Sequence, residues 1–332
     1  MQIGEVMSKS KGINRVLTLE LARVTERAAV AAAGLIGRGD EKAADQAAVD
    51  AMRRELNSLE IDGEVVIGEG ERDEAPMLYI GEKVGKGKGP KVDIALDPLE
   101  GTTLTAKGMP NALAVVAMAE AGSLLNAPDA YMDKIALGGN YPDDIVDLDA
   151  TPEENVKAVA TVKGVGVELI NVCILDRPRH AAMIARVREC GARVTLISDG
   201  DIAGVIHTTD PSTGIDLYMG TGGAPEGVLA AAALRCTGGQ MQGRLVLNGD
   251  DQKERARKMG ITDFDRKYKV DEMAKGDVVL SATGVTSGSM LSGISHQNGV
   301  IWTETLLMRS LTGTIRWIKA CHANRDKFHL ND

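Results

Sequence analysis

Apolar residues at spacings of three and four positions predict two long helices near the N-terminus. One apolar stripe runs through residues 17–36 and a second through residues 43–59. Asp45 lies four positions before Val49, so it is expected on the buried face of the second helix, near the start of that helix. A carboxylate on such a face is unusual. Two interpretations stay open for it, namely a role at the helix terminus and a functional role.

Shorter apolar runs after these helices predict strands. Residues 64–67 and 92–96 have the pattern of two strands, and residues 112–119 form a further apolar run. The strand at 92–96 is expected to stop at Asp97, because Pro98 restricts the residue before it to an extended conformation.

From about residue 170, strands and helices alternate. This order predicts a βαβ layer with crossover helices, and the polar run at 249–271 is expected to form a surface helix or excursion. A glycine-rich interruption places a domain boundary near residue 165. The expected strands are 171–175, 193–197 and 215–219, and the expected helices are 180–190, 202–206 and 228–234.

Composition narrows the class of protein. The chain has 332 residues, of which 44% are hydrophobic and 26% charged, which is ordinary for a globular protein. The net charge of −9 and the aromatic content of 3% argue against nucleic acid or an anionic membrane as a partner. Four scattered cysteines favour reduced thiols in the cytoplasm. No apolar run approaches the ~20 residues that cross a bilayer, and we expect no targeting segment.

The segment DPLEGTT at residues 97–103 carries the strongest chemical signal. Its two carboxylates, Asp97 and Glu100, are expected at a strand end beside a glycine turn and the hydroxyl of Thr102. Such a group suits hard cations that bind a phosphate. Asp-Pro and Glu-Gly pairs are also common in plain turns. Other acidic clusters beside strand ends or glycines favour metal-dependent phosphate chemistry.

Two further acidic or glycine-rich loops follow predicted strands. The carboxylates crowded into residues 69–74 form either a metal site or a solvated loop. In GTGGAPEG, residues 220–227, backbone N–H groups at a helix N-terminus favour an oxyanion, and Glu226 would reach a metal. The alternative for this segment is a plain strand-to-helix turn.

Two polar turns complete the set. Arg177 and Arg179, on either side of Pro178, would bind a phosphate bidentately or form a solvated basic turn. The segment 198–201, SDGD, would bind sugar hydroxyls or cap the next helix. Ligands of open α/β sheets gather beyond the carboxyl ends of the strands. The shared position of these clusters therefore predicts one site.

Seven segments in this order resemble class II fructose-1,6-bisphosphatase: GRGDEKAADQAAVDAM, VVIGEGERDEAPMLYIGE, DPLEGTT, NAPDAYMDK, DRPRH, SDGD and GTGGAPEG. The resemblance extends over about residues 14–316, whereas DPxEGT alone would indicate only the wider lithium-sensitive sugar and inositol phosphatase superfamily. It implies an α/β fold with α/β/α/β/α layers, in which two mixed sheets have helices between and outside them. Residues 1–165 would form an α+β metal-binding domain and residues 166–332 an α/β substrate-binding domain.

The resemblance also implies an activity: hydrolysis of the 1-phosphate of fructose 1,6-bisphosphate to fructose 6-phosphate and phosphate, with two or more Mn²⁺ or Mg²⁺ ions. By motif, Asp45 and Glu69 would hold one ion, and Asp97, Glu100 and Glu226 another. The reacting phosphate would contact Glu100, Gly101 and Thr102, and Thr102 would orient the attacking water with Asp73. The sugar and its second phosphate would contact Tyr131, Arg177, Pro178, Arg179, Asp199, Gly200, Asp201 and Gly223.

One departure from the family pattern concerns a lysine. Many relatives have GDKxxAD where this chain has GDEKAAD, so Lys42 stands one place later and inherits no role. Two alternative functions stay open. One is a phosphatase of dual or primary specificity for sedoheptulose 1,7-bisphosphate, or one for an inositol phosphate, and the other is a non-catalytic sugar-phosphate sensor. The intact acidic set and Thr102 argue against the sensor. We expect direct hydrolysis without a phosphoenzyme, by a cytoplasmic homodimer or homotetramer.

Overall fold

The computed structural model of the chain describes residues 13–70 and 77–329, which form alternating layers of helices and sheets. The helices are α1 (Arg15–Ala33), α2 (Glu41–Leu56), α3 (Thr102–Lys107), α4 (Pro152–Lys163), α5 (Ala181–Glu189), α6 (Asp201–His207), α7 (Ala224–Thr237), α8 (Asp250–Lys258) and α9 (Val270–Met273). The strands are β1 (Asp62–Ile67), β2 (Lys83–Val84), β3 (Lys91–Glu100), β4 (Leu113–Glu120), β5 (Tyr131–Leu137), β6 (Asn171–Leu175), β7 (Arg193–Ile197), β8 (Leu217–Gly223), β9 (Gln240–Val246), β10 (Tyr268–Lys269), β11 (Val278–Gly284), β12 (Ser295–Gln297), β13 (Val300–Arg309) and β14 (Thr314–His322).

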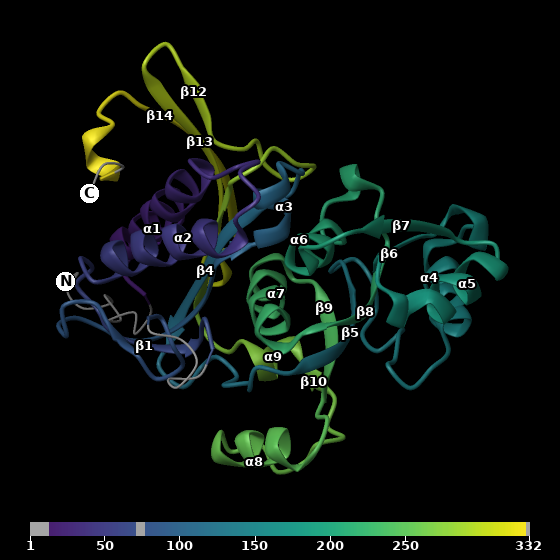
Figure 1. Cartoon of the computed structure of the whole chain (residues 1–332). Helices are drawn as coiled ribbons and strands as arrows, with labels where there is room; N and C mark the ends of the chain where they lie inside the picture. Colours follow the sequence, from purple (N-terminus) through teal and green to yellow (C-terminus); the bar gives the residue numbers. More distant parts are fainter. Residues whose placement is uncertain (1–12, 71–76, 330–332) are drawn as a thin grey trace, which may run out of the picture.

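The layers follow the expected α/β/α/β/α order (Figure 1). Helices α1 and α2 pack on an eight-stranded sheet of order β12-β13-β11-β4-β3-β1-β2, in which β14 also pairs with β13. Helices α6 and α7 fill the space between this sheet and a six-stranded sheet of order β10-β9-β5-β8-β6-β7. Helices α4 and α5 cover the outer face of the second sheet. The two predicted N-terminal helices are confirmed as α1 and α2.

The central strands of the first sheet, β3, β4 and β11, are buried on both faces, which explains their nearly continuous apolar sequences. Along β3, Ile94 and Leu96 pack in the cluster of α1 and α2, whereas Ala95 packs in the cluster of the middle layer. Strand β4 alternates in the same way, with Val116 on the first side and Ala117 on the second. Helix α7 is apolar around almost its whole circumference, apart from Glu226 in its first turn and the exposed Arg235 in its last, because it packs against both sheets.

The second sheet contains the predicted βαβ units. Strand β6 pairs in parallel with β7 on one side and with β8 on the other, while β5 runs antiparallel to β8 and β9. The chain leaves β6 toward the outer helix α5 and leaves β8 toward the inner helix α7. The carboxyl ends of these neighbouring strands therefore form a topological switch point, where open α/β sheets bind ligands.

Both sheets take strands from both halves of the chain. Strand β5 lies in the second sheet, whereas β11, β13 and β14 lie in the first. The division into domains 1–165 and 166–332 stays a prediction.

No helix in the described part of the chain is long and apolar enough to cross a membrane. The four cysteines are free, as expected.

A buried polar chain holds the end of β14 against α1. Because the ammonium group of Lys327 can only donate, His322 Nδ1 accepts from it at 2.7 Å. His322 Nε2 then carries the proton and donates to Thr303 Oγ1 at 3.0 Å, and the Thr303 hydroxyl donates to Glu26 Oε1 at 3.0 Å. Burial and the nearby Lys327 lower the pKa of His322 to about 4. The neutral ring is therefore part of the folded structure.

This chain of hydrogen bonds through His322 predicts that the stability of the protein depends on pH. The folded-state pKa of His322 lies below its ordinary value of 6.5, so its contribution is present above pH 6.5 and is lost as the pH falls toward 4. His322→Gln should reduce the loss of unfolding free energy between pH 7 and pH 4.5 by about 1 kcal/mol, a value that allows for solvent screening. Urea denaturation across this range measures the slope. His296→Gln, at an exposed position of β12, should keep the wild-type slope; an unchanged slope in His322→Gln would contradict the assignment.

Candidate active site

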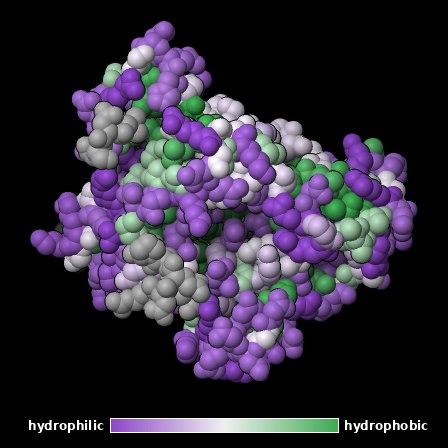
Figure 2. Space-filling model, in the orientation of Figure 1, coloured by the Kyte–Doolittle hydropathy of each residue, from purple (hydrophilic) through white to green (hydrophobic). Residues whose placement is uncertain are grey.

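A cavity of about 660 Å³ brings the predicted site residues together. Figure 2 shows a hollow near the centre of one face, surrounded mainly by hydrophilic residues. Asp73 lies outside the described residues, and Pro178 begins a short 3₁₀ helix (Pro178–His180) without lining the cavity. The other predicted residues all line it: Asp45, Glu69, Asp97, Glu100, Gly101, Thr102, Tyr131, Arg177, Arg179, Asp199, Gly200, Asp201, Gly223 and Glu226.

A β-bulge places Asp97 and Glu100 on the same side of β3. The strand does not stop at Asp97, as the sequence suggested, but continues to Glu100. Asp97 is opposite Val115 and Glu100 is opposite Leu113, so three steps along β3 match two along β4. Residues three apart on a regular strand point to opposite faces, and the extra residue cancels this difference. Pro98 lies in the bulge, where a missing N–H group is tolerated.

The start of α2 separates the two interpretations of Asp45. Asp40 is the capping residue, because its Oδ1 accepts from the Ala43 backbone N–H at 3.0 Å. Asp45 lies one turn further on, is half-buried and faces the cavity. The structure therefore leaves the carboxylate of Asp45 free for a role in the site.

The segment after β1 is held by residues that sequence reasoning missed. The Glu69 backbone N–H donates to the Leu78 carbonyl at 3.0 Å, and the Leu78 N–H donates to the carboxylate of Glu82. Arg53 of α2 pairs with that carboxylate at 2.6 Å. Glu69 is thus fixed relative to the helix that carries Asp45. Glu82 stands in an irregular segment, and nothing local in the sequence distinguishes it from a solvated carboxylate.

The carboxylates of the cavity oppose one another's ionisation. Burial, followed by repulsion from Asp45 and Glu226, raises the pKa of Glu69 to about 8. Burial and then the charge of Glu100 raise the pKa of Asp97 well above its ordinary range. Glu100 Oε1 accepts from the Ile202 N–H at 2.9 Å, whereas its Oε2 is buried without a partner. This wall of the cavity is therefore short of positive charge.

The acidic wall fits a divalent cation by its chemistry. Carboxylate oxygens are the donors that Mg²⁺ and similar hard cations take, and a cation would relieve the repulsion and engage the unpaired Glu100 oxygen. Within residues 13–70 and 77–329, however, no group of three or more His, Cys, Asp or Glu side chains is arranged so that it could hold a metal ion. The predicted ligands share a cavity without forming a closed coordination shell.

The opposite side of the cavity is basic and aromatic. The Nε and Nη2 atoms of Arg179 donate to the Thr221 carbonyl at 2.9 and 2.8 Å, and the guanidinium lies 4.8 Å from the centre of the Tyr131 ring. Arg177 pairs with Asp199 at 3.5 Å. Bonding to a carbonyl and stacking on a ring fix the guanidinium in place. The guanidinium of Arg179 is therefore preorganised to bind an anion.

His180 attaches this basic turn to the second sheet. Its Nε2 accepts from the Thr221 N–H at 2.8 Å, so its Nδ1 carries the proton and donates to the Leu175 carbonyl at 2.8 Å. Burial lowers the pKa of His180, which favours this neutral form. The DRPRH segment thus spans the ends of β6 and β8, where the topology predicts a ligand.

Comparison with known proteins identifies the family. The family model described as bacterial fructose-1,6-bisphosphatase, glpX-encoded, matches residues 15–322. The chain belongs to this family. It is 47% identical over 324 residues to "Fructose-1,6-bisphosphatase 1 class 2" of Escherichia coli (strain K12), covering 93% of this chain and 96% of that relative. The class 2 fructose-1,6-bisphosphatase of Shigella flexneri has the same identity and coverage. The resemblance found in the sequence is confirmed.

Sequence reasoning missed other residues of this fructose-1,6-bisphosphatase cavity. Asp129 and Gln252 line it, the latter from α8. Lys134 lies behind its wall, fully buried on β5, and pairs with Asp201. The sequence feature that could have identified Lys134 is its position, a lysine inside the otherwise largely apolar strand sequence MDKIAL. Another correction concerns GTGGAPEG: its glycines belong to β8 up to Gly223, and α7 begins directly at the next residue.

The repulsion among the carboxylates predicts that Glu69→Gln stabilises the chelated protein at high pH. The pKa of Glu69 is raised from 4.5 to about 8, so folded stability is lost as the pH rises through this interval. In a chelator at pH 8 the variant should exceed the wild type by roughly 2 kcal/mol in unfolding free energy, and the gain should vanish near pH 4.5. Glu64→Gln, on the exposed side of β1, should show no such gain. A variant less stable than the wild type at pH 8 would contradict the analysis.

Proposed function

We propose that this protein hydrolyses the 1-phosphate of fructose 1,6-bisphosphate, giving fructose 6-phosphate and phosphate, with the help of divalent cations. Family membership supports the reaction. The observation that carries the proposal is a single cavity with an acidic wall, from Asp45 to Glu226, and a basic wall formed by Arg177 and Arg179. Such a cavity suits a small molecule with a phosphate at each end.

The acidic wall would bind the reacting phosphate. Asp45 and Glu69 would hold one cation. Asp97, Glu100 and Glu226, which share the cavity without a closed coordination shell, would hold another together with water or substrate oxygens. Bound cations supply the positive charge and the activated water that phosphate hydrolysis needs. Thr102 follows directly after Gly101, whose φ of +91° turns the chain from β3 into α3. Its hydroxyl would orient the attacking water, and the shared role of Asp73 stays a prediction.

The basic wall would bind the rest of the substrate. Arg179, fixed against Thr221 and Tyr131 through Nε, Nη2 and its guanidinium plane, would contact the second phosphate from its Nη1 side. Arg177 would do so from beside Asp199. The segment Asp199–Asp201 would accept hydrogen bonds from sugar hydroxyls. Binding energy from this distant phosphate would position the reacting one.

Direct hydrolysis predicts that purified protein releases phosphate from fructose 1,6-bisphosphate in Mn²⁺ and leaves fructose 6-phosphate. Thr102→Ala should lower kcat by ~10²-fold with little change in KM, because an orienting hydroxyl acts mainly in the transition state. Thr102→Ser should retain much more activity. Equal losses in the two variants would mean that the methyl group matters and not the hydroxyl.

A substrate panel tests the choice of substrate and of metal. It contains fructose 1,6-bisphosphate, sedoheptulose 1,7-bisphosphate and inositol phosphates, each in Mn²⁺ and in Mg²⁺. A wild-type protein inactive on all of them would contradict the proposed hydrolysis and favour the non-catalytic sensor.

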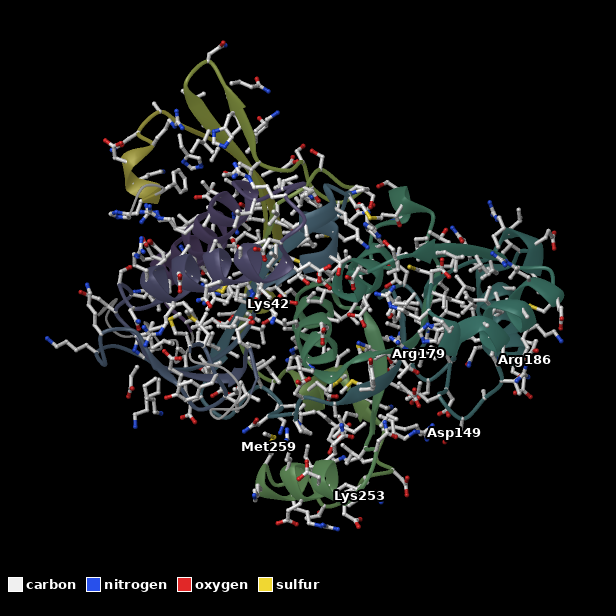
Figure 3. The ribbon with its side chains drawn as sticks, viewed as in Figure 1. Lys42, Asp149, Arg179, Arg186, Lys253 and Met259 are labelled. Atoms are coloured by element: carbon white, nitrogen blue, oxygen red, sulfur yellow. The ribbon has the colours of Figure 1, made fainter. Side chains whose placement is uncertain are left out.

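The basic wall predicts a substrate-dependent effect of Arg179→Ala. This variant should raise KM for fructose 1,6-bisphosphate by ~10-fold or more, and should scarcely change hydrolysis of a small aryl monophosphate, which has no second phosphate. Arg179→Lys should restore only part of the lost affinity for fructose 1,6-bisphosphate, because an ammonium group lacks the bidentate fork of the guanidinium. The matched control is Arg186→Ala: Figure 3 shows Arg186 further out on α5, and it pairs with Glu153 at 2.6 Å. Losses of similar size on both substrates would place Arg179 at the reacting phosphate or in the framework.

The cytoplasmic location and the homodimer or homotetramer stay predictions. Size-exclusion chromatography with light scattering measures the oligomeric state directly.

A further inference from the structure

Lys134 is a fully buried lysine behind the wall of the cavity. Its ammonium group donates to the carboxylate of Asp201, at the start of α6, and to the carbonyl of Gly223 at 2.8 Å, which precedes α7. The relative exposure of Lys134 is 2% and that of Asp201 is 5%. Asp201 also accepts from the Tyr218 hydroxyl at 3.4 Å. Lys134 therefore connects two segments that each carry a proposed site residue.

Packing alone does not account for a lysine at this position. Met132 and Ala136, two residues before and after it on the same side of β5, belong to the apolar cluster of the middle layer. Removing an ammonium group from water costs several kcal/mol, and apolar residues of similar volume often replace a buried ion pair without loss of stability. The ion pair therefore points to a role in holding a geometry.

The backbone around Lys134 leaves little freedom. A Cβ added at Gly222 would collide with the Asp201 carboxylate and would lie 2.9 Å from Lys134 Nζ. A Cβ added at Gly223 would collide with the side chain of Glu226. Lys134, Asp201 and Glu226 thus pack directly against the two glycines at the end of β8. A shift of the Gly223 carbonyl would move the first turn of α7, which carries Glu226.

We propose that Lys134 is a positioning residue that fixes Asp201 and the Gly223 carbonyl relative to each other. Through Asp201 it would orient a carboxylate of the sugar side, and through Gly223 it would set the position of Glu226 on the cation side. This inference rests on the proposed function of the cavity. Residues that orient metal ligands from behind change metal affinity by roughly 10–100-fold when they are replaced.

Lys134→Met tests the proposal with two readouts. The Mn²⁺ dissociation constant from isothermal titration calorimetry should rise by ~10-fold or more, and KM for fructose 1,6-bisphosphate should rise by a similar factor. The matched control is Lys163→Met, because Lys163 forms another lysine–aspartate pair, with Asp216, and neither residue lines the cavity. This control should keep both constants within about twofold, a change worth less than 0.5 kcal/mol by the usual conversion. Wild-type affinity and KM in Lys134→Met would overturn the proposal.

A second variant removes the risk that an unpaired buried carboxylate unfolds the protein. Lys134→Met combined with Asp201→Asn leaves no buried charge at the pair and should restore stability. Mn²⁺ binding should stay weak in this double variant, because the Gly223 carbonyl still lacks its donor. Recovery of both stability and wild-type Mn²⁺ affinity would show that Lys134 only neutralises Asp201. Calorimetric binding does not need turnover, so an inactive wild type would contradict the proposed reaction and leave this test intact.

Discussion

The cavity depends on one electrostatic constraint: several carboxylates are held close together in a partly buried space. Burial raises the pKa of Glu69, Asp97 and Glu226, and repulsion from neighbouring carboxylates adds to the effect at each of them. Like charges in a medium of low dielectric constant would spread apart if the chain allowed it. The surrounding structure must therefore oppose this repulsion through packing and backbone hydrogen bonds, and the acidic wall stores a free energy that a bound cation would release.

The layered fold supplies the rigidity that this constraint requires. The acidic residues come from α2, from the segment after β1, from the bulge of β3 and from the first turn of α7. Each of these elements is fixed on an apolar cluster that lies between a sheet and its helices. Native packing density makes such clusters resist displacement. The repulsion at the cavity is thereby opposed by burial elsewhere.

The basic wall is built from a different part of the fold, because its residues lie at the topological switch point of the second sheet. The turn after β6 carries both arginines, and His180 and Arg179 bind it to Thr221 at the end of β8. The two walls therefore belong to different sheets. The middle layer of α6 and α7, which packs on both sheets, sets the distance between the two walls. The middle layer therefore determines how long a substrate must be to contact both walls.

The sequence by itself determined the periodic elements, the βαβ units and the strand-end motifs, because hydrophobic spacing and turn residues act over a few positions. The layered α/β/α/β/α order followed only from the family resemblance of its motifs. It also indicated most of the residues that line the cavity. Only the tertiary structure decided that Asp97 and Glu100 share a face, since the bulge depends on pairing with β4. The contacts of Glu82 with Arg53 and of Lys134 with Asp201 join residues 29 and 67 positions apart. Such contacts follow from long-range packing, which no local pattern encodes.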